Sequence, residues 1–472
     1  MYLTNNLKEN LDMLKSVLNV DESFDILERI INIHGVKFYL YFVDGFVKDV
    51  NFEYIRRDMM NLNKDEFMTI NSATDLIEKA ISSIETSTEN DIDKIVTSIL
   101  SGQTAMFGMD FNEAIVIDLR TYPSRSVGEP EQEKVLRGSH DGFVETIVFN
   151  TTLIRRRIRD AHLVFKMYNI GNITKTDVAV GYMTNKVNKK ILEKVEKYIE
   201  KLNIQALTLG DQSLVEVVQN KSWLNPYPRV RYTERPDVAA SQIIEGDVII
   251  LIDNTPSVLI LPSNIFSFFQ SVDDYYMPVF TGNYLRLVRT LVLIFNLFLT
   301  PIFVLIVENP NWLSENFKFL LPTDKISVPL YMQFLIMEIA VDGLKIASLN
   351  TPSALGTSLS IIGGLILGDY AVKTGWFVPQ SIFYMAIVAL SSFVQPSIEF
   401  SFALKFSRMI LLILTGLFGV AGFFAGIILN LIIIIRTKTF SGESYLYPLI
   451  PFNWRALRKV IFRWKKEVKK KQ

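Results

Sequence analysis

The sequence predicts an α/β N-terminal region made of two subdomains, followed by an α-helical transmembrane domain of about four to six helices. Three observations lead to this fold class. Residues 1–280 mix charged and apolar side chains as soluble domains do. Residues 287–435 contain long, nearly uncharged stretches, and a bilayer-spanning helix requires about 20 predominantly apolar residues. The chain then ends in a segment rich in Lys and Arg.

The overall composition hides this division. The 472 residues carry a formal net charge of zero and a mildly positive mean hydropathy, because a polar half averages with an apolar half. The length is typical of about three domain-sized units. We expect cytoplasmic subdomains at 1–165 and 166–280, a helical transmembrane domain at 281–440 and a basic cytoplasmic tail at 441–472.

Within the N-terminal region, hydrophobic periodicity and turn residues define the expected elements. A strand pair is expected at 37–47 with its turn at Asp44-Gly45, and a hairpin at 246–262 with its turn around Asn254. A strand–helix–strand pattern from Lys175 on indicates an α/β unit. The remaining elements, in chain order, are short amphipathic helices at 1–35, polar helices at roughly 50–100, a half-buried strand at 109–125, a basic helix at 141–163, a strand at 176–183, a helix at 186–202 and a strand at 204–209.

Charge at the two ends of the chain predicts the orientation. The first 20 residues contain no long apolar core, so we expect no signal peptide and a cytoplasmic front half. The tail is strongly basic, which places it in the cytoplasm under the positive-inside rule. With both ends on one side, the number of full crossings must be even. The basic residues of the tail are Arg455, Arg458, Lys459, Arg463, Lys465, Lys466, Lys469, Lys470 and Lys471.

The apolar segments do not satisfy that parity directly. Four spans are clear, at 287–307, 353–372, 376–394 and 409–435. The segment 331–349 is long enough but charged, and counting it gives five crossings. Either it is interfacial or re-entrant, or the stretch 398–435 is a broken pair. We favour four full spans, with 331–349 lying partly in the membrane.

Charged residues within the apolar half are candidates for an ion path. Glu338, Asp342 and Lys345 are spaced i, i+4 and i+7, so they share one helical face. Charges in hydrocarbon are costly, so this face should meet water, a pore or another subunit. An interfacial helix whose charges reach the headgroups is the competing interpretation, and both stay open. Asp369 is a further candidate, although a residue near a span end is more often a simple boundary residue.

Small residues recur on two of the spans. One stripe consists of Gly356, Ser360, Gly364 and Gly368, and a second consists of Gly422 and Gly426. Small side chains on one stripe let helix backbones approach closely. The stripes predict tight helix packing, within the chain or between subunits of an oligomer.

The search for catalytic chemistry returns nothing. The chain has no Cys and three scattered His, and contains no P-loop, dinucleotide fingerprint or HExxH pattern. We therefore expect no enzyme activity, no cofactor and no metal site. The basic run Arg155, Arg156 and Arg157 could bind nucleic acid or anionic lipid. Nearby acidic residues favour salt bridges or a subunit interface instead, so no nucleic-acid partner is expected.

Several segments resemble the GerA family, the A subunits of bacterial spore germination receptors. They are PSRSVGEPEQEKVLRG (123–138), DGFVETIVFNTTLIRRRIRD (141–160), NPYPRVRYTERPDVAA (225–240), EGDVIILIDNTPSVLILP (245–262) and FFQSVDDYY (268–276). DGFVETIVFN and the short N-terminal region resemble the stage V sporulation branch more than the nutrient-receptor subunits. The residues that carry the resemblance include Glu129, Pro130, Arg137, Gly138, Asp141, Gly142, Phe143, Glu145, Arg155, Arg156, Arg157, Tyr232, Glu234, Arg235 and Pro236.

The resemblance implies a protein of the spore inner membrane whose soluble region and termini face the core. It implies ring-like homo-oligomers that form a cation channel, with a multi-span B-subunit-type partner. For the sporulation branch it implies amplified germination with ion or dipicolinate release. The leading hypothesis is therefore an oligomeric channel subunit. A non-conducting scaffold that regulates another channel and a secondary transporter are the alternatives.

Overall fold

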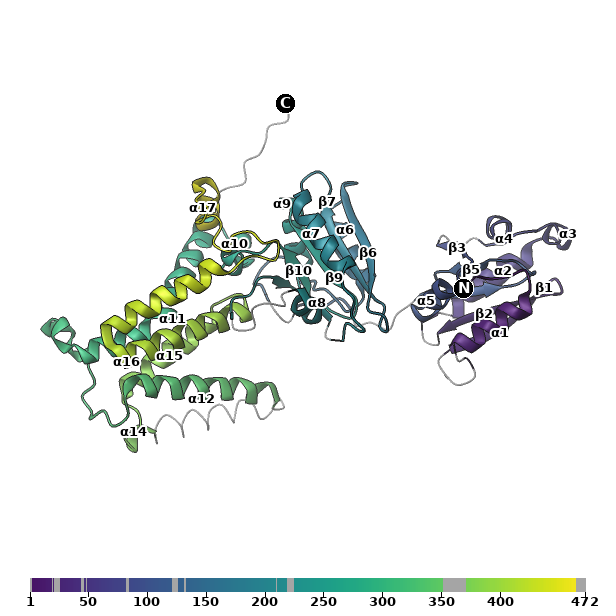
Figure 1. The fold of residues 1–472 in the computed structure, drawn as a ribbon. Helices are drawn as coiled ribbons and strands as arrows, with labels where there is room; N and C mark the ends of the chain where they lie inside the picture. Colours follow the sequence, from purple (N-terminus) through teal and green to yellow (C-terminus); the bar gives the residue numbers. More distant parts are fainter. Residues whose placement is uncertain are drawn as a thin grey trace, which may run out of the picture. The chain divides into compact units, whose positions relative to one another are not determined.

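The computed structural model describes residues 2–18, 20, 26–43, 46–47, 49–81, 85–120, 126–130, 133–208, 210–218, 225–350 and 371–463. The chain divides into two compact units, Met1–Ser126 and Val127–Gln472 (Figure 1). The first holds one sheet. The second holds another sheet together with the helical C-terminal part.

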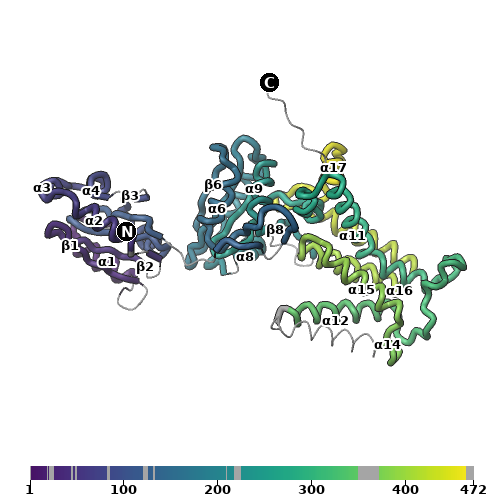
Figure 2. The backbone as a smooth tube through the Cα atoms, turned by 180° about the vertical axis from the view of Figure 1, so that it is seen from behind, coloured from purple at the N-terminus to yellow at the C-terminus, as the bar shows by residue number. Residues whose placement is uncertain are grey.

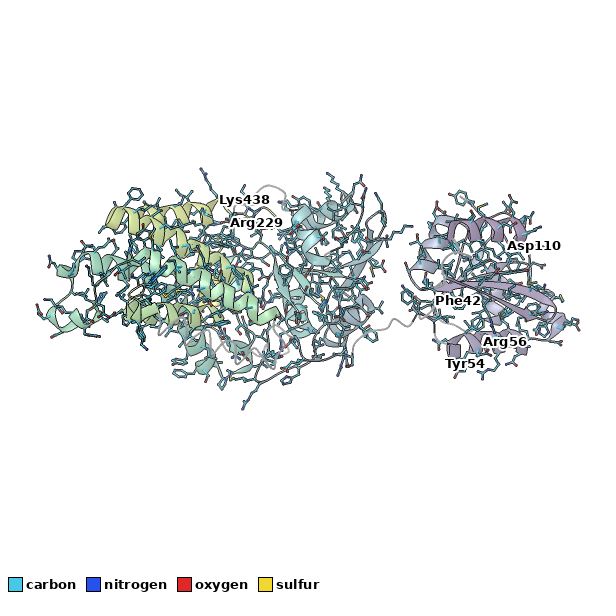
Figure 3. The ribbon with its side chains drawn as sticks, turned by 90° about the horizontal axis from the view of Figure 1, so that it is seen from below. Phe42, Tyr54, Arg56, Asp110, Arg229 and Lys438 are labelled. Atoms are coloured by element: carbon cyan, nitrogen blue, oxygen red, sulfur yellow. The ribbon has the colours of Figure 1, made fainter. Side chains whose placement is uncertain are left out.

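The first unit is a five-stranded antiparallel sheet with helices on both faces. Its elements are α1 (Leu7–Leu18), β1 (Ile26–Ile33), β2 (Val36–Val43), α2 (Asp49–Asn61), α3 (Lys64–Phe67), α4 (Ala73–Ala80), β3 (Thr86–Glu89), α5 (Ile92–Leu100), β4 (Thr104–Phe107) and β5 (Ala114–Ile117). The strand order is β1-β2-β4-β5-β3. Leu14 of α1 and Ile95 of α5 pack on one face, and Met59 of α2 and Leu76 of α4 pack on the other. Figure 3 labels Tyr54 of α2.

The predicted N-terminal elements are partly wrong. Residues 26–33, assigned to helix, form β1, which pairs along its whole length with β2. The turn lies at His34-Gly35, where φ is +50° and +93°, and a two-residue turn that follows the twist of a hairpin requires positive φ at both positions. The predicted turn residues, Asp44 and Gly45, lie outside the described residues.

The second unit begins with another five-stranded antiparallel sheet. Its elements are α6 (Ile147–Arg157), β6 (Leu163–Ile170), β7 (Thr176–Met183), α7 (Lys189–Glu200), α8 (Gly210–Val218), β8 (Arg231–Thr233), α9 (Pro236–Glu245), β9 (Val248–Ile252) and β10 (Val258–Leu261), in the strand order β6-β7-β9-β10-β8. Ile154 of α6 and Ile243 of α9 pack on one face, and Val195 of α7 and Leu214 of α8 pack on the other.

Two predictions for this sheet have opposite outcomes. The β9–β10 hairpin is confirmed, with Asn254 in its turn at φ +66°. The predicted strand at 204–209 is wrong over its described part, because residues 204–208 form no strand. A strand–helix–strand unit would place this segment beside β7, but β6 and β9 already occupy both edges of β7. The carbonyls of Ile204 and Gln205 instead accept hydrogen bonds from Asn172 and Ile173, which follow β6 (3.0 and 2.8 Å).

The helical part follows directly from the second sheet. It comprises η1 (Ile265–Phe268), α10 (Asp273–Tyr276), α11 (Val279–Glu308), η2 (Pro310–Trp312), η3 (Glu315–Leu320), α12 (Leu330–Asn350), α14 (Ala371–Lys373), α15 (Pro379–Phe393), α16 (Ile398–Arg436) and α17 (Trp454–Ile461). α11 and α16 are long and apolar enough to cross a membrane, and α15 is apolar but shorter. Figure 2 shows α12, α15 and α16 from behind. Most of the predicted span 353–372 lies outside the described residues, including Gly356, Ser360, Gly364, Gly368 and Asp369.

α16 is two helical arms rather than one straight helix. Gly419 breaks it, with φ +58° and ψ −136°, a conformation open to glycine and strained for other residues. Asn430 donates a hydrogen bond to the carbonyl of Ser407 (3.1 Å), so residues 398–418, the first arm, and 420–436, the second arm, lie antiparallel. The predicted single span at 409–435 is therefore wrong. The broken pair at 398–435, weighed as an alternative, is what the structure shows.

Small residues let the two arms approach each other. A Cβ at Gly426 would lie 2.7 Å from the Leu411 side chain, and one at Gly422 would clash with the Leu414 carbonyl. The Gly422 and Gly426 stripe thus packs one arm on the other within a single chain. Gly419, at the tip, lies near Glu308 at the end of α11. The opposite end of the helices carries Arg286 and Arg436, and we call it the basic end.

Candidate functional site

A set of ionisable side chains lies between the apolar helices, three of them buried and the fourth, Asp342, 31% exposed. Glu338 and Asp342 lie one turn apart on α12, and Lys405 and Arg408 lie three residues apart on the first arm of α16. These four side chains form the charge network. Because i, i+3 and i, i+4 positions share a helical face, each helix turns its two charges toward the other.

The Glu338–Arg408 pair forms the centre of the network. Nη2 of Arg408 lies 2.5 Å from Oε1 of Glu338, and its Nε donates to the same oxygen at 2.7 Å. Both side chains are 3% exposed. Arg408 Nη1 also donates to the carbonyl of Asn296 on α11 (2.9 Å) and to its side-chain oxygen. The Asn296 amide donates to the Val388 carbonyl of α15 (3.3 Å), so the network connects four helices.

Lys405 completes the charge balance. Its ammonium group contacts Asp342 directly and lies 3.8 Å from Glu338 Oε2. Two carboxylates thus face two cations, which keeps the buried group formally neutral. Removing one partner from such a group leaves an uncompensated buried charge and costs about 3–5 kcal/mol.

The structure brings together only part of the predicted ion-path set. Glu338 and Asp342 share the network, whereas Lys345 lies apart, 3.3 Å from Ser392 Oγ and over the ring of Phe393. Asp369 lies outside the described residues. On this face Glu338 is buried, whereas the side chain of Asp342 is 31% exposed. The role of this face in an ion path stays a prediction.

Sequence reasoning missed Lys405, Arg408 and Asn296. The signal was present, since two cations three residues apart stand in the apolar stretch 398–435. The predicted span began at residue 409, so Lys405 and Arg408 lay outside it. Two acidic and two basic residues in otherwise apolar helices would have indicated mutual pairing.

The residue between the two cations connects the network to the second sheet domain. Ser407 Oγ lies 2.7 Å from the hydroxyl of Tyr227, and burial raises the pKa of that hydroxyl. Asn225 donates to Thr437 Oγ1 at the end of α16 (2.7 Å). Rings surround these contacts: Phe400 stacks on Phe268 with 5.9 Å between centroids. We call these contacts the junction; Figure 3 labels Arg229 and Lys438 in this part of the second unit.

Many of the resemblance-carrying residues build a polar scaffold beside β8 and α9. Arg235 is fully buried, pairs with Asp237 (2.8 Å) and donates to the carbonyls of Glu133 and Ser139. Gly142 donates to the Gly128 carbonyl (2.6 Å). Four more of these residues have defined positions: Phe143 is buried, Pro236 begins α9, the Tyr232 hydroxyl donates to Gln212, and Glu129 lies 3.3 Å from His140.

The basic run on α6 serves internal contacts. Arg157 pairs with Asp141 at 2.5 Å. Burial alone would raise the pKa of Asp141, but Arg157 and Ser139 outweigh it and hold that pKa below its usual value. Arg155 donates to the carbonyls of Asp160 and Leu163. The interpretation of this run as a salt-bridging segment agrees with these contacts.

Comparisons with known proteins cover nearly the whole chain. A family model described as Bacillus/Clostridium GerA spore germination protein matches residues 12–472. Stage V sporulation protein AF of Bacillus subtilis is 34% identical, over 97% of this chain and 92% of that protein. Spore germination protein KA of the same organism is 28% identical over 82% and 71%, and spore germination protein A1 is 27% identical over 94% and 88%.

A solved structure is among the matches. The N-terminal domain of the A subunit of the Bacillus megaterium spore germinant receptor GerK3 aligns with 55% of this chain and 96% of that chain, at 24% identity and a TM-score of 0.23. The family match over 12–472 and the 34% identity to stage V sporulation protein AF agree with the segments quoted from the sequence. The chain belongs to the GerA family of spore germination proteins.

Proposed function

We propose that this chain is a subunit of an oligomeric ion channel in the spore germination apparatus, and that the charge network borders its ion path. The buried Glu338–Arg408 pair is the observation that carries the proposal. Ionisable residues within membrane helices are expensive, face a bundle interior or an aqueous cavity, and mark ion pathways. The neutral, paired network corresponds to a closed state.

The junction gives a route for opening. Ser407 lies between the two cations of the network and contacts Tyr227 of the second sheet domain. A displacement of that domain would move the first arm of α16 and separate its cations from the carboxylates of α12. A partner or trigger can shift the equilibrium between the closed and the open state only by as much as its affinities for these two states differ.

The proposal includes a topology and a location. α11, α12, α15 and the two arms of α16, with the predicted span 353–372, give six crossings and satisfy the expected even number. Basic residues gather at the end that carries Arg286 and Arg436, which favours a core-facing basic end in the spore inner membrane. A homo-oligomer and a multi-span B-subunit-type protein are the proposed partners. No catalytic step is proposed.

Flux measurements test the proposal. The purified full chain in lipid vesicles should pass monovalent cations, and Glu338→Gln with Asp342→Asn should change the rate or the ion selectivity. Glu315→Gln, an exposed carboxylate in η3, should leave flux unchanged. Absence of flux from protein that retains its oligomer would contradict the proposal.

A non-conducting scaffold is the second candidate, and one observation favours it. Every carboxylate of the network contacts a cation, as expected for charges that only hold helices together. In that case the double variant Glu338→Gln with Asp342→Asn would lower the unfolding temperature. This chain alone would pass no ions, and the double variant would change the flux through a separate partner channel.

A further inference from the structure

A large basic cavity lies at the basic end of the helices. Its volume is about 1320 Å³, and its walls come from α9, α10, the start of α11 and α17. Six of its lining residues are cations, and two are acids, Asp237 and Glu245. Asp237 is already held by Arg235. The six cations are Arg231, Arg286, Arg455, Arg458, Lys459 and Arg463.

A buried arginine cluster adjoins this cavity, and two of its members, Arg286 and Arg463, line it. Arg286 and Arg289 share one carboxylate, Asp274, at 3.3 and 2.8 Å. Arg463 donates to the carbonyls of Asp274 and Met277. Two guanidinium groups therefore share a single carboxylate, while the third contacts only backbone carbonyls, and the cluster keeps an excess of positive charge.

Two guanidinium groups of the cluster have unused hydrogen-bonding capacity. Arg286 is 7% exposed and lines the cavity. Among the described residues, no hydrogen-bond partner is found for its Nη2, for Nε of Arg289 or for Oδ1 of Asp274. A buried charged donor without a partner is costly. Arg286 lines the cavity, so an anion bound there would offset the excess positive charge beside it, and Arg is well suited to bind phosphate.

The surroundings of the cavity favour a lipid as the source of that anion. On α17, Arg455, Arg458 and Lys459 are spaced i, i+3 and i+4 and line the cavity. Exposed aromatic residues flank them, namely Phe452, Trp454 and Phe462. Basic residues beside exposed Trp and Phe are typical of helices that lie at an anionic membrane surface. The first turns of α11 add exposed apolar side chains, among them Phe280 and Leu287.

We propose that this cavity binds the phosphate group of an anionic phospholipid, with Arg286 as the buried anchor and Arg455, Arg458 and Lys459 at the entrance. The bound headgroup contacts α11, α17 and the α9 side of the second sheet domain. Lipid binding therefore fixes α17 and the sheet domain against the first membrane helix. This role does not depend on whether the chain conducts ions.

Lipid titration of the full-length protein in detergent tests the proposal. Dioleoylphosphatidylglycerol should raise the unfolding temperature in a concentration-dependent way, and dioleoylphosphatidylcholine should raise it far less. The triple change Arg455→Gln, Arg458→Gln and Lys459→Gln should weaken the apparent affinity about a hundredfold. It leaves the buried cluster intact, so the fold is preserved. Native mass spectrometry should show the retained lipid directly.

A matched control and two soluble probes separate the outcomes. Lys189→Gln, Lys190→Gln and Lys197→Gln remove three exposed cations from α7 and should leave the lipid response unchanged. Equal stabilisation by both lipids, or an unchanged response in the α17 variant, would overturn the proposal. If inorganic phosphate or glycerol 3-phosphate reproduces the full shift, the site binds a soluble anion and the lipid assignment is wrong.

Discussion

At the scale of single residues, the Glu338–Arg408 pair joins α12 to the first arm of α16. A buried ion pair gains little net stability over an apolar pair of the same shape, but it is specific, because a misplaced helix leaves a charge unpaired. Arg408 also satisfies the carbonyl and side chain of Asn296. The pair therefore fixes the relative positions of α11, α12 and α16.

The single variants of this pair should lose more stability than the double variant. Glu338→Gln or Arg408→Met alone should lower the free energy of unfolding by about 3–5 kcal/mol, because each leaves a buried charge. The double variant should recover much of that loss. Unfolding of the purified protein in detergent, followed by tryptophan fluorescence, measures the difference. Additive losses would show that the two side chains do not act as a pair.

Asp247 gives a pH-dependent prediction outside the membrane. Burial raises its pKa to about 7, Glu245 adds to the rise, and Arg231 opposes it. The unfolded value is about 3.9, so the folded state binds the proton more tightly. Its stabilising contribution is present below about pH 4 and is lost as the pH rises through 7.

Asp247→Asn should therefore raise the unfolding temperature at pH 8 and leave it nearly unchanged at pH 4. Because the side chain of Asp247 is partly exposed, the expected rise in unfolding temperature is small. Glu193→Gln on the exposed face of α7 serves as the control. An equal shift at both pH values would show that the effect does not come from this carboxyl group.

At the scale of elements, the α16 hairpin depends on Gly419. Gly419→Ala should cost about 1–3 kcal/mol, because an L side chain is strained at this φ and ψ. Gly343→Ala is a matched control in α12, where no atom lies within 4 Å of the added Cβ. The control should be neutral or stabilising by about 0.5–1 kcal/mol, as for other helix glycines. Thermal unfolding of the two variants measures both changes in stability. An equal change in Gly419→Ala and Gly343→Ala would contradict the role of Gly419.

Local signals predicted some elements well, and non-local pairing explains the errors. The β9–β10 hairpin follows from two apolar runs around Asn254, and all of that information is local. Residues 26–33 form a strand because they pair with β2. Residues 204–208 do not form a strand beside β7, because β7 already has neighbours on both edges. Gly419 stands among other glycines in an apolar run, and composition does not show which of them breaks the helix.

The candidate site was half predicted for a similar reason. Glu338 and Asp342 stand out as isolated charges in an apolar segment. Their partners, Lys405 and Arg408, are more than 60 residues away along the chain. Residue spacing within one helix does not specify its partner, so the pairing required the three-dimensional structure.

At the scale of the whole second unit, the junction connects the second sheet domain to α16. Tyr227→Phe removes the hydrogen bond to Ser407 and should cost about 0.5–1.5 kcal/mol. It should also change the flux rate of reconstituted protein. Tyr198→Phe, an exposed ring on α7, is the matched control. A stability loss without any change in flux would show that the junction is structural only.

The central claim is that the charge network borders an ion path, and cysteine accessibility tests it most directly. The chain contains no Cys, so a single introduced thiol reports on one position. In conducting vesicles, Asp342→Cys should react with a cationic, membrane-impermeant thiol reagent, and flux should fall. Phe383→Cys, at an exposed apolar position on α15, should not respond. Flux that continues unchanged after complete modification of Asp342→Cys would contradict the account.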